Sequence, residues 1–138
     1  WNKMIYNGCE LSFSLERFIN IISIYTYKML TRKDLITLNQ QFSNGQIMNE
    51  SGLDFVLKQT YRSPHWFKTM CLLARTIVLD HVFEDGNKRT GAAIIMASLE
   101  MNDYHYDPDK ISQIAIRIAK SHIRDTTKIG ILIKNATI

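Results

Sequence analysis

The chain has 138 residues, 46% of them hydrophobic, and a formal net charge of +4. This length suits one domain with a real core, and the apolar fraction is typical of a globular protein rather than a disordered one. The mild charge is spread along the chain, which disfavours a specific nucleic-acid partner, and no apolar run is long enough for a membrane span.

Residues 1–30 combine helical and strand-like features. Apolar side chains recur at the spacing of one helix face at Leu11, Leu15, Phe18, Ile22 and Tyr25. This spacing predicts a helix at about residues 11–24. Residues 19–27 are also rich in β-branched side chains that partly alternate, so the structure of the rest of this region stays open.

A helix is predicted to begin close to Thr31. Thr31 and Asp34 resemble a capping box, in which each side chain bonds the backbone amide of the other residue. The apolar face of the helix consists of Leu35, Leu38 and Phe42. The sequence Ser-Asn-Gly at residues 43–45 then ends the helix.

A polar connector, residues 46–50, leads to the next helix. A small hairpin in this connector is the alternative to a plain loop. A short helix follows with Ser51 and Asp54 at its start. Ser63, which precedes a proline, is expected to end this helix, and the proline to start the next one.

Two strongly apolar helices are predicted on either side of a polar loop in the middle of the chain. The stripe of the first consists of Phe67, Met70, Cys71, Ala74, Ile77 and Val78. His81 falls next on this stripe, so its ring is expected to point into the fold. The stripe of the second consists of Ala92, Ile95, Met96 and Leu99. Both helices are apolar nearly all round, which is typical of the centre of a bundle.

Two further helices complete the chain. Asp107, followed by a proline, opens the first, whose stripe consists of Ile111, Ile114, Ala115, Ile118 and Ala119. Asp125 is expected to cap the last helix. We therefore predict a single all-α domain over residues 1–138, a compact helical bundle of about six or seven helices. The remaining histidines, His65, His105 and His122, do not have metal-ligand spacing and are interpreted as surface or packing residues.

The two cysteines, Cys9 and Cys71, are isolated in the sequence. Such spacing indicates neither a disulfide framework nor a zinc site. A reducing, cytoplasmic setting is therefore expected.

The polar loop between the two apolar helices carries the residues suited to chemistry. Gly86 permits a sharp turn, and Asn87 is a good N-cap for the helix that follows, whose dipole favours an anion. Lys88 supplies a point charge and Arg89 a planar fork, both suited to phosphate oxygens. Asp85 is a hard oxygen ligand beside that phosphate site, as magnesium requires.

His81 completes this set. A histidine has an ordinary pKa of roughly 6.5 and can accept a proton from an attacking hydroxyl. A base, a metal ligand and a phosphate cradle would then meet within one turn. The alternative is that Asp85 to Asn87 are turn and capping residues without a ligand, and that His81 is a core histidine.

Residues 81–89, which read His-x-Phe-x-Asp-Gly-Asn-Lys-Arg, resemble the signature of the Fic/Doc family at all seven constrained positions. The resemblance implies that His81 is the general base and that Asp85 binds Mg2+. It implies that Asn87 and Arg89 hold the phosphates of a nucleotide, and that the phenylalanine anchors the loop in the core.

Two departures indicate which branch of the family the chain is closest to. The adenylylating branch usually has glycine at the position of Lys88 and often a second arginine at the position of Ala92. Lysine and no second arginine are similar to the Doc, or death-on-curing, branch, which is known for phosphorylating a protein. In this view residues 29–138 are the Doc-like core, with residues 46–50 as the flap that aligns the target, and residues 1–28 are an extension packed on it.

Within that extension, Ser12 and Glu16 match the first half of an autoinhibitory motif found in some Fic proteins. Arg17 breaks the second half of the motif. The second arginine that such a glutamate normally engages is also missing at Ala92. An ordinary packing helix is therefore the better interpretation.

The expected function is transfer of a phosphoryl group from ATP to a Ser or Thr hydroxyl of a target protein, with Mg2+ as cofactor. The resemblance implies elongation factor Tu as the target, a toxin-like role, and an antitoxin that docks beside the nucleotide site. Two alternatives remain: a Fic-type adenylyltransferase that transfers AMP, and a degenerate, non-catalytic binding module.

Overall fold

The computed structural model describes residues 2–6, 9–13, 30–63 and 65–138. Within these ranges the chain forms six helices and one β-hairpin. The helices are α2 (Arg32–Asn39), α3 (Glu50–Arg62), α4 (Trp66–Leu79), α5 (Asn87–Met101), α6 (Pro108–Ser121) and α7 (Thr126–Ala136). The prediction of an all-α bundle of six or seven helices is confirmed.

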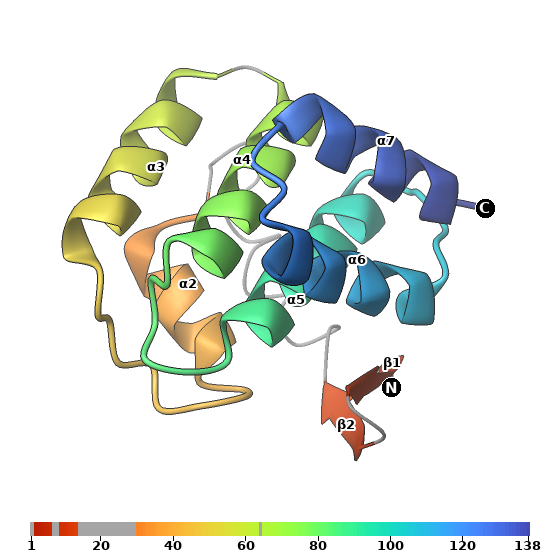
Figure 1. Cartoon of the computed structure of the whole chain (residues 1–138), viewed down its shortest axis with the longest axis horizontal. Coiled ribbons are helices and arrows are strands. Elements are labelled where there is room, and N and C mark those ends of the chain that lie inside the picture. The colour runs from red at the N-terminus through yellow and green to blue at the C-terminus, as the bar shows by residue number, and fades with distance from the viewer. Residues whose placement is uncertain (1, 7–8, 14–29, 64) are drawn as a thin grey trace.

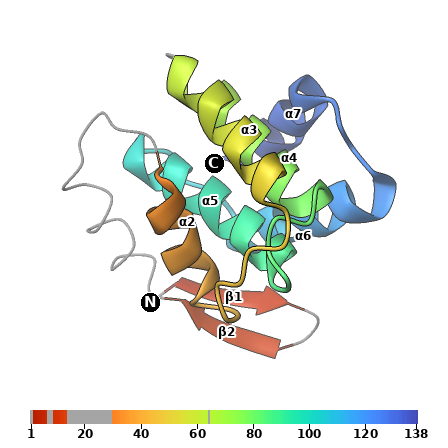
Figure 2. The same ribbon diagram turned by 90° about the vertical axis from the view of Figure 1, so that its left-hand side faces the viewer.

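Helices α4 and α5 form the centre of the bundle (Figure 1). Helix α3 packs on α4, and α2 packs on α5, on one side of this central pair. Helices α6 and α7 contact the pair from the other side and pack on each other (Figure 2). The polar loop that joins α4 to α5 is therefore held by the two most enclosed helices.

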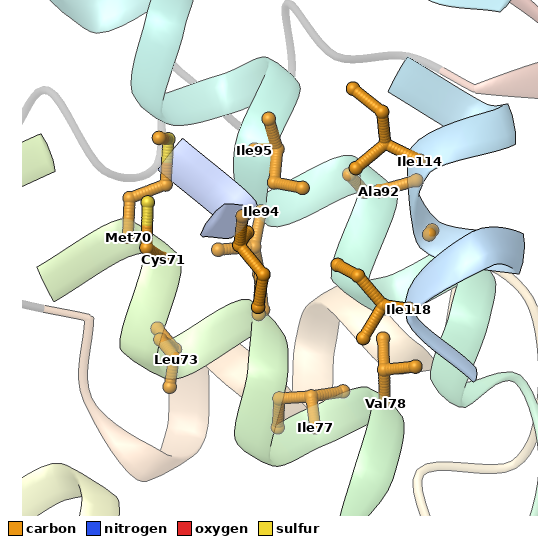
Figure 3. Packing of buried hydrophobic residues seen from close by; sticks show 14 of the residues in the cluster. Met70, Cys71, Leu73, Ile77, Val78, Ala92, Ile94, Ile95, Ile114 and Ile118 are labelled. Carbon is orange, nitrogen blue, oxygen red and sulfur yellow. The ribbon is translucent and has the colours of Figure 1, made fainter. Parts of the chain in front are cut away.

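The core lies where α4, α5 and α6 meet (Figure 3). Ile77 and Val78 on α4, Ile94 and Ile95 on α5, and Ile118 on α6 are at most 3% exposed. Gly91 on α5 allows this close packing, since a Cβ there would lie 2.5 Å from Cγ2 of Val78. The stripes read from the sequence thus face the core, and both central helices are buried on most sides as predicted.

Side chains at the predicted positions cap three helices. Thr31 and Asp34 form the expected capping box of α2. Asp107 caps α6 and Asp125 caps α7, in each case by accepting backbone N–H bonds from the first turn. Helix α3 begins one residue earlier than expected, because Asn49 accepts the amide of Gly52 and acts as its cap.

The N-terminal region contains a hairpin where the sequence favoured a helix. Strands β1 (Asn2–Tyr6) and β2 (Cys9–Phe13) pair antiparallel, and β1 lies beside α6. The prediction of a helix at about 11–24 is wrong for residues 11–13, which belong to β2, and residues 14–24 lie outside the described ranges. The local helical spacing was outweighed there by the antiparallel pairing of β2 with β1.

The connector at 46–50 contains no hairpin of its own. Ile47 instead forms an isolated antiparallel bridge with Phe83, in the loop between α4 and α5. Ile47 is partly buried and packs against the hydrophobic core, so its side chain as well as its backbone attaches the connector to the bundle. Of the helices that the structure describes, none combines the length and apolar character needed to cross a bilayer.

Cys71 gives a prediction for the pH dependence of stability. The residue is 2% exposed, and burial raises the pKa of its thiol from an ordinary 9.0 to about 11, with Lys134 acting in the opposite direction. Between about pH 9 and 11 the unfolded chain loses this proton while the folded chain keeps it, so stability falls as the pH rises. We expect a loss of about 1 to 2 kcal/mol across this window.

Denaturant unfolding at several pH values measures this effect. Cys71→Ala is the matched control, since it keeps every other titrating group, including Cys9. The unfolding free energy of the variant should decline less over the same window. Parallel curves for the two proteins would contradict the assignment.

Candidate active site

The loop between α4 and α5, residues 80–86, is called the motif loop below. Together with the first turn of α5 and the end of α6 it borders a hollow of about 270 Å³. The lining residues are Val78, Leu79, His81, Glu84, Asp85, Gly86, Asn87, Lys88, Arg89, Ala119 and His122. All six residues predicted from the sequence as catalytic, phosphate-binding or metal-binding line this one hollow.

His81 lies just past α4, whose C-cap is Asp80. Its backbone is left-handed, with φ of 47°, and the residue is exposed at the hollow. The prediction that its ring points into the fold is therefore wrong. The helical spacing on which that prediction rested ends at Leu79, and the left-handed residue turns the chain off the helix.

This position removes the main alternative for His81, that of a buried and satisfied core histidine. No hydrogen bond to its ring is found in the part of the chain that the structure describes. Left-handed backbone is uncommon outside glycine, although histidine adopts it more readily than most residues. An exposed ring beside a polar hollow is free to meet a hydroxyl of a second molecule.

Phe83 and Asn87 fix the shape of the motif loop. Phe83 is 1% exposed and anchors the loop in the core, as predicted. The Asn87 side chain accepts the Phe83 N–H at 2.9 Å and donates to the Phe83 carbonyl at 2.8 Å. These two bonds close the loop from residue 83 to residue 87 into a ring.

Asn87 is not the N-cap that the sequence predicted. Gly86 occupies that position in a left-handed conformation, with φ of 77°, and Asn87 is the first helical residue. A Cβ at Gly86 would lie 3.2 Å from Nδ2 of Asn39, so both the backbone angle and the close approach of α2 require glycine. The side-chain carboxamide of Asn87 is bonded to the backbone of Phe83, so this side chain braces the loop.

The start of α5 offers backbone donors to an anion. The first hydrogen bond of α5 runs from Thr90 N–H to the Gly86 carbonyl at 2.8 Å. The backbone N–H groups of Asn87 and Lys88 precede it and have no acceptor within the helix. With the helix dipole, such donors favour a bound phosphate.

Arg89 is held at the edge of the hollow. Its Nη2 lies 3.4 Å from Oδ2 of Asp85, and its guanidinium lies 5.9 Å from the ring centroid of Phe42. The Arg89 side chain is 21% exposed and that of Asp85 73%. Because the Asp85 carboxylate is mostly exposed, water weakens its attraction for Arg89, so Asp85 does not prevent Arg89 from binding a phosphate.

Asp85 is the residue for which the sequence predicts a magnesium ion. Its exposed carboxylate borders the hollow together with Glu84. Among the described residues, no group of three or more His, Cys, Asp or Glu side chains converges as a metal site. Magnesium is often held by one or two carboxylates together with substrate phosphates, so this donor set suits a magnesium–nucleotide complex better than a bare ion.

Helix α6 supplies a wall of the hollow that the sequence did not reveal. Ala119 and His122 line it, and His122 is an exposed, left-handed C-cap with φ of 47°, like His81. The sequence interpretation of His122 as a surface or packing residue did not predict that it lines the hollow. No local pattern could have done so, since the packing of α6 on α5 decides it.

Comparison with known proteins adds nothing to this description of the site. A scan against protein-family models gives no match, and a search of curated proteins gives none. What supports a function is therefore the site itself, in which a histidine, an exposed carboxylate and two cations surround the start of one helix.

Proposed function

We propose that this chain is a nucleotide-dependent transferase that modifies a Ser or Thr hydroxyl of a target protein, with ATP as donor of a phosphoryl group. The observation that carries the proposal is the common hollow of four groups with complementary roles: His81, Asp85, Lys88 and Arg89. The resemblance of residues 81–89 to the Fic/Doc signature supports the same activity.

The proposed reaction is an in-line displacement at the γ-phosphorus of ATP. The target hydroxyl loses its proton to His81, its oxygen bonds to the γ-phosphorus, and ADP leaves. His81 can serve because it is exposed at the hollow rather than buried. It then passes the proton to solvent.

The cations and amides of the first turn of α5 stabilise the charge that develops on the phosphoryl oxygens. Lys88 and Arg89 act through their side chains, and Asn87 acts through its backbone N–H. A magnesium ion held by Asp85 would neutralise further charge on the phosphates. The braced motif loop keeps these donors in place, so little reorganisation is needed during transfer.

Labelled ATP tests this activity directly. The purified chain is incubated with magnesium, a cell lysate, and ATP that carries the label on either the α- or the γ-phosphate. Label from the γ-position on a protein band supports phosphoryl transfer. Label from the α-position supports transfer of AMP, and no label from either position would contradict both.

Lys88 gives the sharpest prediction about the transferred group. Lys88 is exposed at the hollow in the first turn of α5, where the adenylylating branch has glycine. Lys88→Gly removes the cation and opens the space it fills, so we expect phosphoryl transfer to drop about tenfold or more. Mass spectrometry of the modified target measures this, because a phosphate and an AMP group add different masses.

The matched control is Lys110→Gly, which removes an exposed lysine from the first turn of α6. Both substitutions place glycine in a helix at a similar cost of about 1 kcal/mol. Lys110→Gly should leave transfer unchanged. A wild-type chain that adds AMP, with Lys88→Gly adding it equally well, would reject the kinase assignment in favour of adenylylation.

The expected setting is the cytoplasm, where ATP is present and the free thiol of Cys71 stays reduced. The Doc-like features make elongation factor Tu the first purified target to assay. They also make an antitoxin that docks beside the nucleotide hollow an expected partner. A non-catalytic binding module remains as the alternative, and it predicts ATP binding without label transfer.

A further inference from the structure

In the structure the connector comprises all residues between α2 and α3, 40–49, and not only the polar stretch read from the sequence. It runs along the motif loop, and both lie at the same end of the bundle (Figure 1). The amides of Met48 and Asn49 donate to the Val82 carbonyl at 2.8 and 3.2 Å. The amide of Glu84 donates to the Gln46 carbonyl at 2.9 Å. The motif loop is therefore paired with a segment distant from it in sequence.

Asn39, the last residue of α2, lies behind the anion side of this loop. It is fully buried, and its Nδ2 donates to the Asp85 carbonyl at 2.9 Å and to Oγ1 of Thr90 at 3.1 Å. Its Oδ1 accepts the Gly45 N–H at 3.0 Å. Both amide hydrogens and the oxygen are thus engaged, and the side chain joins the motif loop, α5 and the connector.

Asn49, at the other end of the connector, holds the histidine side of the loop. Its Nδ2 donates to the Asp80 carbonyl at 2.8 Å, next to His81. Its Oδ1 accepts the amide of Gly52 at 2.9 Å and so caps α3. One side chain thus ties the start of α3 to the end of α4.

We infer that Asn39 and Asn49 are positioning residues, Asn39 for the anion half of the site and Asn49 for the histidine half. Neither lines the hollow, so neither is placed to touch a substrate. Each bonds the carbonyl of a residue that is, or adjoins, a functional residue. The catalytic consequence rests on the proposed function, whereas the effect on the loop does not.

Two substitutions separate the roles. Asn39→Ala removes the donors to Asp85 and Thr90, which releases the anion half. Asn49→Ser keeps an oxygen that can cap α3 and removes the donor to Asp80. Ser112→Ala is the matched control, because this 2% exposed serine donates to the Pro108 carbonyl within α6, away from the loop.

The first readout is a split between binding and rate, measured with magnesium ATP on the full chain. Asn39→Ala should weaken ATP binding by about tenfold or more. Asn49→Ser should leave ATP affinity within about twofold and lower the transfer rate by about tenfold or more, since small misplacements of a reacting group are costly. A loss of general stability would not divide the two effects in this way, and Ser112→Ala should show neither.

The second readout, amide hydrogen exchange, is independent of any activity. In Asn39→Ala the amide of Glu84 should exchange at least about tenfold faster relative to the amides of α6, which report overall unfolding. In Asn49→Ser the amide of Met48, which donates to the Val82 carbonyl, should likewise exchange at least about tenfold faster relative to the amides of α6. If Asn39→Ala does not fold, Thr90→Val removes one of its bonds and should act in the same direction more weakly.

The outcomes separate the two proposals. Exchange of the Glu84 and Met48 amides that rises no more than exchange in α6 would overturn the positioning role. Equal effects of both substitutions on ATP affinity would overturn it as well. A wild-type chain that neither binds ATP nor transfers label would reject the proposed function. The exchange pattern would still decide the positioning role in that case.

Discussion

Replacing His81 by alanine is expected to lower group transfer by about a hundredfold or more, while folding and ATP affinity stay close to those of the wild type. The substitution removes the one base at the hollow that the proposed mechanism uses. It leaves Asp85 and the donors of α5 unchanged. Because His81 is exposed but its backbone is left-handed, which alanine adopts less readily than histidine, the substitution should cost about 1 kcal/mol of stability.

Label transfer at matched concentrations of folded protein measures this effect, with ATP affinity determined on the same samples. His65→Ala is the matched control, since His65 is an exposed histidine at the opposite end of α4. It should transfer label at the wild-type rate. Full activity of His81→Ala would reject the mechanism, and an equal loss in both variants would point to a general effect on the fold.

Replacing Phe83 by alanine should lower the free energy of unfolding by about 3 to 5 kcal/mol. Phe83 is among the largest fully buried side chains in the described structure. It lies in a loop whose backbone is held by Asn87 and pairs with Ile47, so the surroundings have little freedom to collapse into the cavity. A loss of this size is a large fraction of the stability of a small domain.

Urea unfolding followed by circular dichroism measures this loss. The control is Phe55→Ala on α3, because Phe55 is 59% exposed and the same atoms are removed. Its cost should stay below about 1 kcal/mol, as for most surface substitutions. Similar costs for the two variants would show that the motif loop is not anchored by its phenylalanine.

The helices of this protein were largely predictable because their signals are local. Thr31, Asp107 and Asp125 each accept amides within the following three residues, so a short stretch of sequence fixes the start of the helix. The apolar stripes of α4 and α5 likewise depend only on helical periodicity. The same reasoning failed at residues 11–13, where pairing with β1 outweighs the local pattern.

The site was predictable in composition but not in geometry. The sequence places His81, Asp85 and Arg89 within one short segment, so they must lie near one another. It did not show that His81 turns outward, because that depends on where α4 ends and on one left-handed residue. It also did not show that Gly86 rather than Asn87 caps α5. The side-chain carboxamide of Asn87 bonds back to the Phe83 backbone and is therefore not used as a cap.

The sequence by itself determined the all-α class, the starts of α2, α6 and α7, and the set of groups available for chemistry, since these follow from interactions over a few residues. The start of α4 was expected at the proline after Ser63, but the helix begins at Trp66. Only the tertiary structure decided what surrounds those groups. The bond from Asn39 to Asp85 joins positions 46 residues apart, and the wall formed by His122 exists because α6 packs on α5. Such contacts depend on how buried helix faces pack together, and no local pattern encodes which distant segments meet.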